Sequence, residues 1–114
     1  MRAIMLGEVN VTLSRLESAF LGVLRDAGLP LPQTNKPAGG HRVDCRWPEH
    51  RLTVELDSYR FHNSYYTWER DHLRAREARS RGDEFRRYTW YDVTEGRAAM
   101  LAELRRLLST RRPA

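Results

Sequence analysis

Residues 41–57 read HRVDCRWPEHRLTVELD, and polar and apolar side chains alternate along two runs within them. Alternation with a period of two is typical of a strand with one buried face. The Pro48-Glu49-His50 segment predicts a turn, so strands over 41–47 and 51–57 should pair as an antiparallel hairpin. The apolar face of this hairpin would join a core. The polar face would carry three acids, Asp44, Glu55 and Asp57.

The chain has 114 residues, which is enough for one domain with a single modest core. We expect a lead-in segment over 1–13, one domain over 14–109 and a basic tail over 110–114. No apolar run approaches the roughly 20 residues of a membrane helix, and the apolar start is too short for a secretory signal. These features predict a cytoplasmic protein.

A helix should precede the hairpin. Ser14 followed by Glu17 forms a capping-box pattern, and the apolar residues after it follow helical spacing. Gly28 should end this helix, because glycine readily adopts the left-handed conformation found after a helix. Glu17 has a second interpretation: if this helix packs beside the hairpin, its carboxylate could hold water near a metal.

Further elements should follow on both sides of the hairpin. The pattern predicts an edge strand over 34–37, a helix ending at Gly82, a strand over 85–90 and a last helix capped by Thr94. The order helix, three strands, helix, strand, helix indicates an α/β sandwich with a mixed sheet. The second helix has a thin apolar stripe that includes Leu73. Its arginines are many: Arg70, Arg74, Arg76, Arg79 and Arg81.

The charge of the chain is carried almost wholly by arginine. The net charge is +5, and of the 20 basic residues only Lys36 is a lysine. Guanidinium groups bind phosphate oxygens in a bidentate way, so a polyanion such as DNA is a plausible partner. An arginine-rich codon usage would give the same composition. The single cysteine, Cys45, excludes an internal disulfide and a cysteine-based zinc cluster, and its place on the apolar face favours a core residue over a nucleophile.

The three acids of the hairpin have two interpretations. Residues directly opposed in a hairpin have Cβ atoms about 5 Å apart, so the acids could converge on one point. Such carboxylates would suit a hard cation such as Mg²⁺ or Mn²⁺. Alternatively, they form ion pairs with the arginines of the same hairpin, namely Arg42, Arg46 and Arg51.

His62 follows Asp57 by five residues, just beyond the second strand of the hairpin. Imidazole titrates near neutral pH and could activate water or protonate a leaving group. A histidine near the start of a helix is also a common surface or capping residue. The spacing alone leaves both interpretations open.

Several spaced motifs together resemble a domain family of unknown function related to the very short patch repair endonucleases. The matching residues are Leu16-Glu17, Ala27-Gly28-Leu29-Pro30, Val43-Asp44, Trp47-Pro48, Arg51-Leu52, Glu55-Leu56-Asp57, His62, Glu69-Arg70-Asp71, Tyr88-Thr89-Trp90 and Val93-Thr94. Both groups belong to the PD-(D/E)XK, or restriction-endonuclease-like, superfamily. The resemblance spans about residues 14–108. It implies a three-layer sandwich with core order α-β-β-β-α-β, here followed by a C-terminal helix.

The resemblance also implies roles for individual residues. Asp44 matches the first strand acid, a metal ligand, and Glu55 matches the acid of the E-x-K motif. Asp57 stands where that motif has lysine, and the only lysine of the chain lies far from it. The repair endonucleases similarly lack this lysine and use histidines. His62 falls where such an enzyme activates water, and Glu17 matches its first-helix acid.

The leading hypothesis is a divalent-metal-dependent DNA endonuclease or nickase. Asp44, Glu55 and Asp57 would hold Mg²⁺ or Mn²⁺, His62 would be the general base, and Glu17 would orient water at the metal. The phosphate backbone would be bound by arginines, namely Arg42, Arg70 and Arg74.

Two other readings stay open: a nucleic-acid-binding module without catalysis, and an interaction module in which the acids form structural salt bridges. The domain also resembles the C-terminal part of longer bacterial proteins found near toxin–antitoxin systems. This resemblance implies that the chain is a fragment of a larger protein or a stand-alone version, with a toxin–antitoxin partner. Cutting both DNA strands would need two sites and hence a homodimer.

Overall fold

The fold is built on a four-stranded mixed sheet with the order β1-β2-β3-β4. The computed structural model describes residues 6–37, 40–58 and 65–109. Neighbouring strands are antiparallel except for β3 and β4, which are parallel. The strands are β1 (Gln33–Asn35), β2 (Arg42–Trp47), β3 (Leu52–Asp57) and β4 (Glu84–Tyr88).

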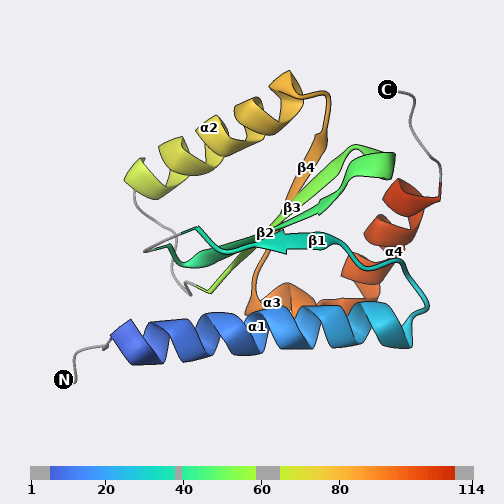
Figure 1. Ribbon diagram of the computed structural model, residues 1–114, viewed down its shortest axis with the longest axis horizontal. Coiled ribbons are helices and arrows are strands. Elements are labelled where there is room, and N and C mark those ends of the chain that lie inside the picture. The colour runs from blue at the N-terminus through green and yellow to red at the C-terminus, as the bar shows by residue number, and fades with distance from the viewer. Residues whose placement is uncertain (1–5, 38–39, 59–64, 110–114) are drawn as a thin grey trace.

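Helices cover both faces of this sheet, which makes three layers. Figure 1 shows α2 on one face and α1, α3 and α4 on the other. A parallel pair of strands requires a crossover connection, and α2 supplies it between β3 and β4. In the described part of the chain, no helix has the length and apolar character needed to cross a membrane. The helices are α1 (Leu6–Asp26), α2 (Tyr65–Ser80), α3 (Trp90–Val93) and α4 (Arg97–Leu108).

The architecture confirms the predicted fold class. The order of elements and the mixed sheet agree with a restriction-endonuclease-like core, with α3 and α4 added after β4. The hairpin of β2 and β3 also forms as predicted, joined by a short 3₁₀ turn over Pro48–His50. Its register places Asp44 directly opposite Glu55 and Arg42 opposite Asp57.

The hydrophobic core lies between the sheet and the layer that contains α1. Phe20 of α1 is fully buried and meets the Trp47 ring edge-on, with ring centroids 6.5 Å apart. The Trp47 indole N–H donates to the Pro30 carbonyl at 2.8 Å, which satisfies the polar atom of this buried side chain. The core contains these further buried residues: Leu13, Leu16, Val23, Leu24, Val43, Cys45, Leu52, Val54, Leu56, Tyr88, Val93, Met100, Leu104, Leu107 and Leu108.

The first helix begins earlier than the sequence indicated. It starts at Leu6, so Ser14 lies in its third turn and is not an N-cap. The expected lead-in over 1–13 is therefore partly helical, and Glu17 does not complete a capping box. The spacing of Ser14 and Glu17 fits a capping box, but the apolar residues before Ser14 continue the 3.6-residue period of the helix. The helix follows this longer pattern.

The last helix also begins differently. Thr89, not Thr94, forms a capping box, in which its backbone N–H donates to Asp92 at 2.9 Å. Thr94 instead ends α3, and its hydroxyl donates to the Trp90 carbonyl at 2.6 Å. The predicted last helix is therefore α4, with Gly96 rather than Thr94 at its N-cap, and α3 is a short helix that was not predicted.

Glycines end α1 and α2 as predicted. Gly28 and Gly82 have φ values of 72° and 84°, which lie in the left-handed region. After Gly82, the Asp83 N–H donates back to the Ala78 carbonyl at 2.9 Å, a bond of the Schellman type. This bond fixes the exit of α2 and directs the chain into β4.

A buried ion-pair cluster joins the end of α2 to the hairpin. Asp83 is 3% exposed and accepts two hydrogen bonds from Arg46, at 2.8 and 2.9 Å. It also accepts one from the Thr53 hydroxyl at 2.7 Å. Burial acts to raise the pKa of Asp83, but the hydrogen bonds from Arg46 and Thr53 outweigh burial and lower the pKa.

Replacing Asp83 with asparagine should lower the free energy of unfolding at neutral pH by about 1–3 kcal/mol, because it removes the charge that Arg46 binds. A carboxylate with a lowered pKa stabilises the fold above its unfolded pKa of about 3.9, and this contribution disappears as the pH falls through the folded value. The difference between wild type and variant should therefore shrink below about pH 4. Urea denaturation at several pH values measures it, with Glu77→Gln on the exposed face of α2 as control. An equal difference at every pH would contradict the assignment.

Candidate metal and nucleic-acid site

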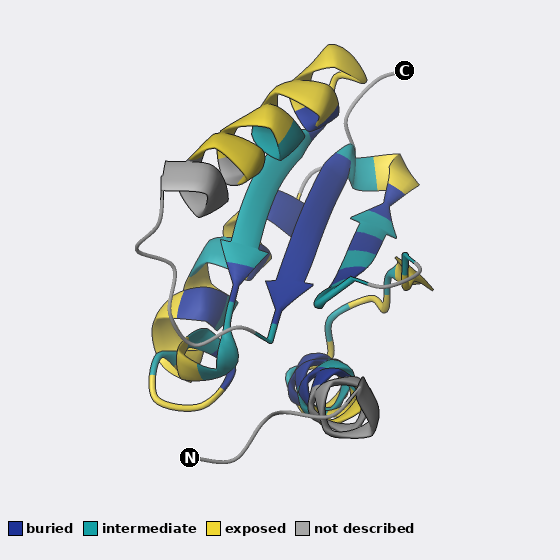
Figure 2. Ribbon diagram, turned by 90° about the vertical axis from the view of Figure 1, so that its left-hand side faces the viewer, coloured by how far each residue is buried: buried dark blue, intermediate teal, exposed yellow. Residues whose placement is uncertain are grey.

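The candidate site lies on the face of the sheet that α2 covers. Side chains alternate along a strand, so Thr53, Glu55 and Asp57 of β3 share this face. Asp44 joins them from β2, because it is the register partner of Glu55. The strand that is dark blue along its whole length in Figure 2 is β3, whose residues are all buried. The acids are thus enclosed rather than spread on an open surface.

Glu55 is the most deeply buried acid of the site, with 2% of its surface exposed. The guanidinium of Arg74, on α2, donates from Nε to Oε2 of Glu55. Arg42 approaches the same oxygen with its Nε at 3.5 Å. Burial raises the pKa of Glu55, and the two guanidinium groups partly oppose that rise. The carboxylate depends on both arginines to remain charged in this position.

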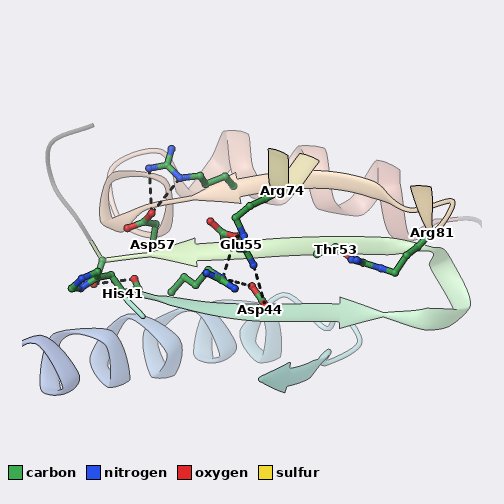
Figure 3. Close-up of polar contacts among 10 residues, drawn as sticks. His41, Asp44, Thr53, Glu55, Asp57, Arg74 and Arg81 are labelled. Atoms are coloured by element: carbon green, nitrogen blue, oxygen red, sulfur yellow. Dashed lines mark hydrogen bonds and ion pairs between the residues drawn. The ribbon is translucent and has the colours of Figure 1, made fainter. Parts of the chain in front are cut away.

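Asp44 is more open and binds the same two arginines. Its side chain is 27% exposed and its Oδ1 accepts from Arg42 Nε at 3.1 Å. Its Oδ2 lies 3.7 Å from Nη2 of Arg74. Figure 3 shows Asp44, Glu55 and Arg74 in one group, and Arg42 contacts both acids. Two carboxylates and two guanidinium groups thus form a cluster of zero formal charge.

Asp57 has a different cation. Its Oδ2 lies 3.5 Å from Nε of Arg87, which comes from β4. In the parallel register of β3 and β4, Arg87 is the partner of Glu55, so it reaches Asp57 diagonally. Among the residues with described side chains, no three histidine, cysteine or acidic side chains are grouped to hold a metal. The structure therefore brings Asp44 and Glu55 together and places Asp57 with Arg87.

The ion-pair interpretation predicted partners on the hairpin, and it was right for only one of them. Arg42 binds the acids, whereas Arg46 binds Asp83. Arg51 donates to the Arg81 carbonyl at 3.1 Å. The other cations of the acids, Arg74 and Arg87, come from α2 and β4. Side chains alternate along β4, so Arg87 has to lie on one face of the sheet. The sequence alone did not indicate which face that is.

The second helix presents a different face from the one predicted. Leu73, expected in its apolar stripe, is 53% exposed, and Arg74 turns toward the sheet instead. Ala78 of the same helix is buried. Arg70 is exposed, as a residue that binds a phosphate backbone from solution would be.

Glu17 lies apart from this group. It is on α1, which packs on the opposite face of the sheet from α2 (Figure 1). Its Oε1 lies 2.8 Å from Nζ of Lys36, the single lysine of the chain. The ion pair explains Glu17 without a cap. His62 lies outside the described residues, as does the expected tail over 110–114.

Comparison with known proteins adds distant relatives. Two uncharacterized proteins of Mycobacterium tuberculosis, one from strain CDC 1551 / Oshkosh and one from strain ATCC 25618 / H37Rv, are each 43% identical to this chain over 54 residues. The match covers 43% of this chain and 20% of each relative, so the chain spans only a small part of their length. No family model matches, and no solved structure matches.

Cys45 belongs to the core and is not a nucleophile. Its side chain is fully buried, and burial, with the nearby charges of Glu17 and Asp44, raises the thiol pKa to about 12. A thiol needs to ionise to react, so it should be inert in the folded protein at pH 8.

We expect no reaction of the native chain with a thiol reagent such as DTNB at pH 8, and one equivalent of reaction in denaturant. The denatured sample is the control for reagent and protein concentration. Rapid modification of the native protein would contradict the burial of Cys45.

Proposed function

We propose that this domain is a divalent-metal-dependent DNA endonuclease or nickase. The observation that carries the proposal is the register of the central hairpin, which sets Asp44 directly opposite Glu55 in a restriction-endonuclease-like sheet. Two carboxylates from adjacent strands provide hard oxygen ligands at one place. Arg42 of β2 and Arg74 of α2 lie beside them and supply groups that bind phosphate.

The donor set suits Mg²⁺ or Mn²⁺. Magnesium sites in phosphate-processing proteins typically use one or two carboxylates and leave the other positions to water and substrate phosphate. Asp44 and Glu55 would hold the ion, with Asp57 as a third acid on the same face. The bound ion would polarise a phosphoryl oxygen and stabilise the leaving oxygen.

The remaining roles belong to residues of this chain. Arg42 and Arg74 already lie beside the two acids and would orient the phosphate. Arg70, exposed on α2, would bind a neighbouring phosphate of the backbone. His62 would take the proton of the attacking water. Glu17, which pairs with Lys36 on the other face of the sheet, has no role in this proposal. We further propose that the domain acts in the cytoplasm, within a longer protein or beside a toxin–antitoxin partner, and as a homodimer where both strands are cut.

Replacing Asp44 with asparagine should reduce relaxation of supercoiled plasmid in Mg²⁺ or Mn²⁺ by at least about 100-fold. The loss should exceed that for residues that only support a ligand, which is typically 10–100-fold. Glu55→Gln should behave in the same way. Glu77→Gln is the control, because it removes an exposed carboxylate of α2 and leaves the acid cluster unchanged. Full cleavage by the Asp44 variant would sink the proposal.

A second candidate function is nucleic-acid binding without catalysis. It is favoured by the arginines that already neutralise the acids and by the acid at the position where the related E-x-K motif has lysine. On this reading the basic face of α2 would bind the phosphate backbone, and added metal would give no product.

Arg70→Gln should lower the slope of log affinity against log salt for duplex DNA by about 1, since one phosphate contact is lost. Arg105→Gln is the matched control, because Arg105 is an exposed arginine of α4 on the opposite face of the sheet. Fluorescence anisotropy at several salt concentrations gives both slopes. Equal slopes for the two variants would argue against α2 as the binding face.

A further inference from the structure

Arg74 occupies a special place among the arginines of α2. Its side chain is 21% exposed, whereas Arg70, Arg76 and Arg79 on the same helix are exposed. It reaches Glu55 and Asp44 together, from an element outside the hairpin. Figure 3 shows Arg74 reaching from α2 toward Glu55 and Asp44. The exposed arginines of the same helix do not share this position.

A guanidinium and a metal ion compete for the same carboxylate oxygens, because both need the space in front of them and both carry positive charge. Arg74 contacts Oε2 of Glu55 and approaches Oδ2 of Asp44, while Arg42 binds Oδ1 of Asp44 and approaches Oε2 of Glu55. A divalent cation that entered this cluster would meet two positive groups at short range. The two arginines therefore weaken metal binding to the free domain, and the ion should bind more tightly when one of them moves away.

A nucleic-acid phosphate is a ligand that can take an arginine from a carboxylate. Phosphate and carboxylate both match the guanidinium fork, and phosphate brings its own negative charge to the site. Arg42 lies two residues from Asp44 on the same strand. Arg74 comes instead from the helix whose outer surface carries exposed arginines, so a phosphate backbone bound there would reach Arg74 first.

We propose that Arg74 couples the two ligands of this site: it blocks the metal position in the free domain and vacates it when nucleic-acid phosphate binds its guanidinium. This rests on the proposed function in that Asp44 and Glu55 are the metal ligands. By linkage, phosphate and metal then raise each other's affinity by the same factor. The domain would hold its metal tightly only on a substrate.

The test is a titration of the free domain with Mn²⁺, followed by water proton relaxation, for wild type and Arg74→Gln. The variant should bind Mn²⁺ on the order of tenfold more tightly, within the usual range of coupling between sites. Arg79→Gln is the matched control: it removes one exposed arginine of the same helix, and its affinity should equal that of wild type. An uncleavable phosphorothioate duplex, with a duplex-only blank, should tighten Mn²⁺ binding to wild type and not to Arg74→Gln.

Loss of Arg74 also removes a counter-charge from buried Glu55, so folding is followed in parallel by thermal unfolding. Mn²⁺ should raise the melting temperature of Arg74→Gln more than that of wild type, because ligand binding stabilises the folded state. Arg74→Lys keeps the charge but loses the fork, and should lie between the two in Mn²⁺ affinity.

Equal Mn²⁺ affinity for wild type, Arg74→Gln and Arg79→Gln would overturn the coupling, as would no Mn²⁺ binding by any of them. If wild type cleaves plasmid while these affinities are equal, the nuclease proposal stands and the coupling fails. If Arg74→Gln binds Mn²⁺ more tightly and no form cleaves DNA, the coupling stands and the nuclease proposal fails.

Discussion

The burial of β3 on both faces is the constraint on which the rest of this structure depends. Its parallel partner β4 requires a crossover, and the crossover helix α2 covers the polar face of the hairpin. Thr53, Glu55 and Asp57 are therefore enclosed although they alternate with core residues. Buried carboxylates are costly unless they are paired, so Glu55 and Asp57 each need a cation nearby.

The cations come from three different elements, and this ties the layers of the fold together. Arg42 of β2, Arg74 of α2 and Arg87 of β4 each lie against an acid of the central strands. On α2 itself, Leu73 is exposed while the neighbouring Arg74 binds the acids of the sheet. The charges that form the candidate site are thus the same charges that dock its covering helix.

Local patterns in the sequence were sufficient for the strands and the long helices, but not for α3 or for the exact register of the hairpin. Period two gave β2 and β3, and the two helix-ending glycines were found because left-handed backbone favours glycine. The predicted helix starts at Ser14 and Thr94 were wrong. Ser14 lies inside α1, and Thr94 ends α3, although both residue types favour the N-cap position. The prediction of the arginine partners was wrong for another reason. Which arginine binds which acid depends on how α2 and β4 pack against the hairpin, and no local sequence pattern encodes that packing.

The acid at residue 57 has its counter-charge on β4. Glu55 and Asp57 lie on one face of β3, where Glu55 is paired with Arg42 and Arg74. Arg87 stands in register beside Glu55 and lies 3.5 Å from Asp57, so the neighbouring strand supplies the cation for Asp57. A lysine at residue 57 would lie beside Arg87, and the two positive charges would repel each other. Asp57 and Arg87 therefore link β3 to β4 by an ion pair that a lysine at residue 57 could not form.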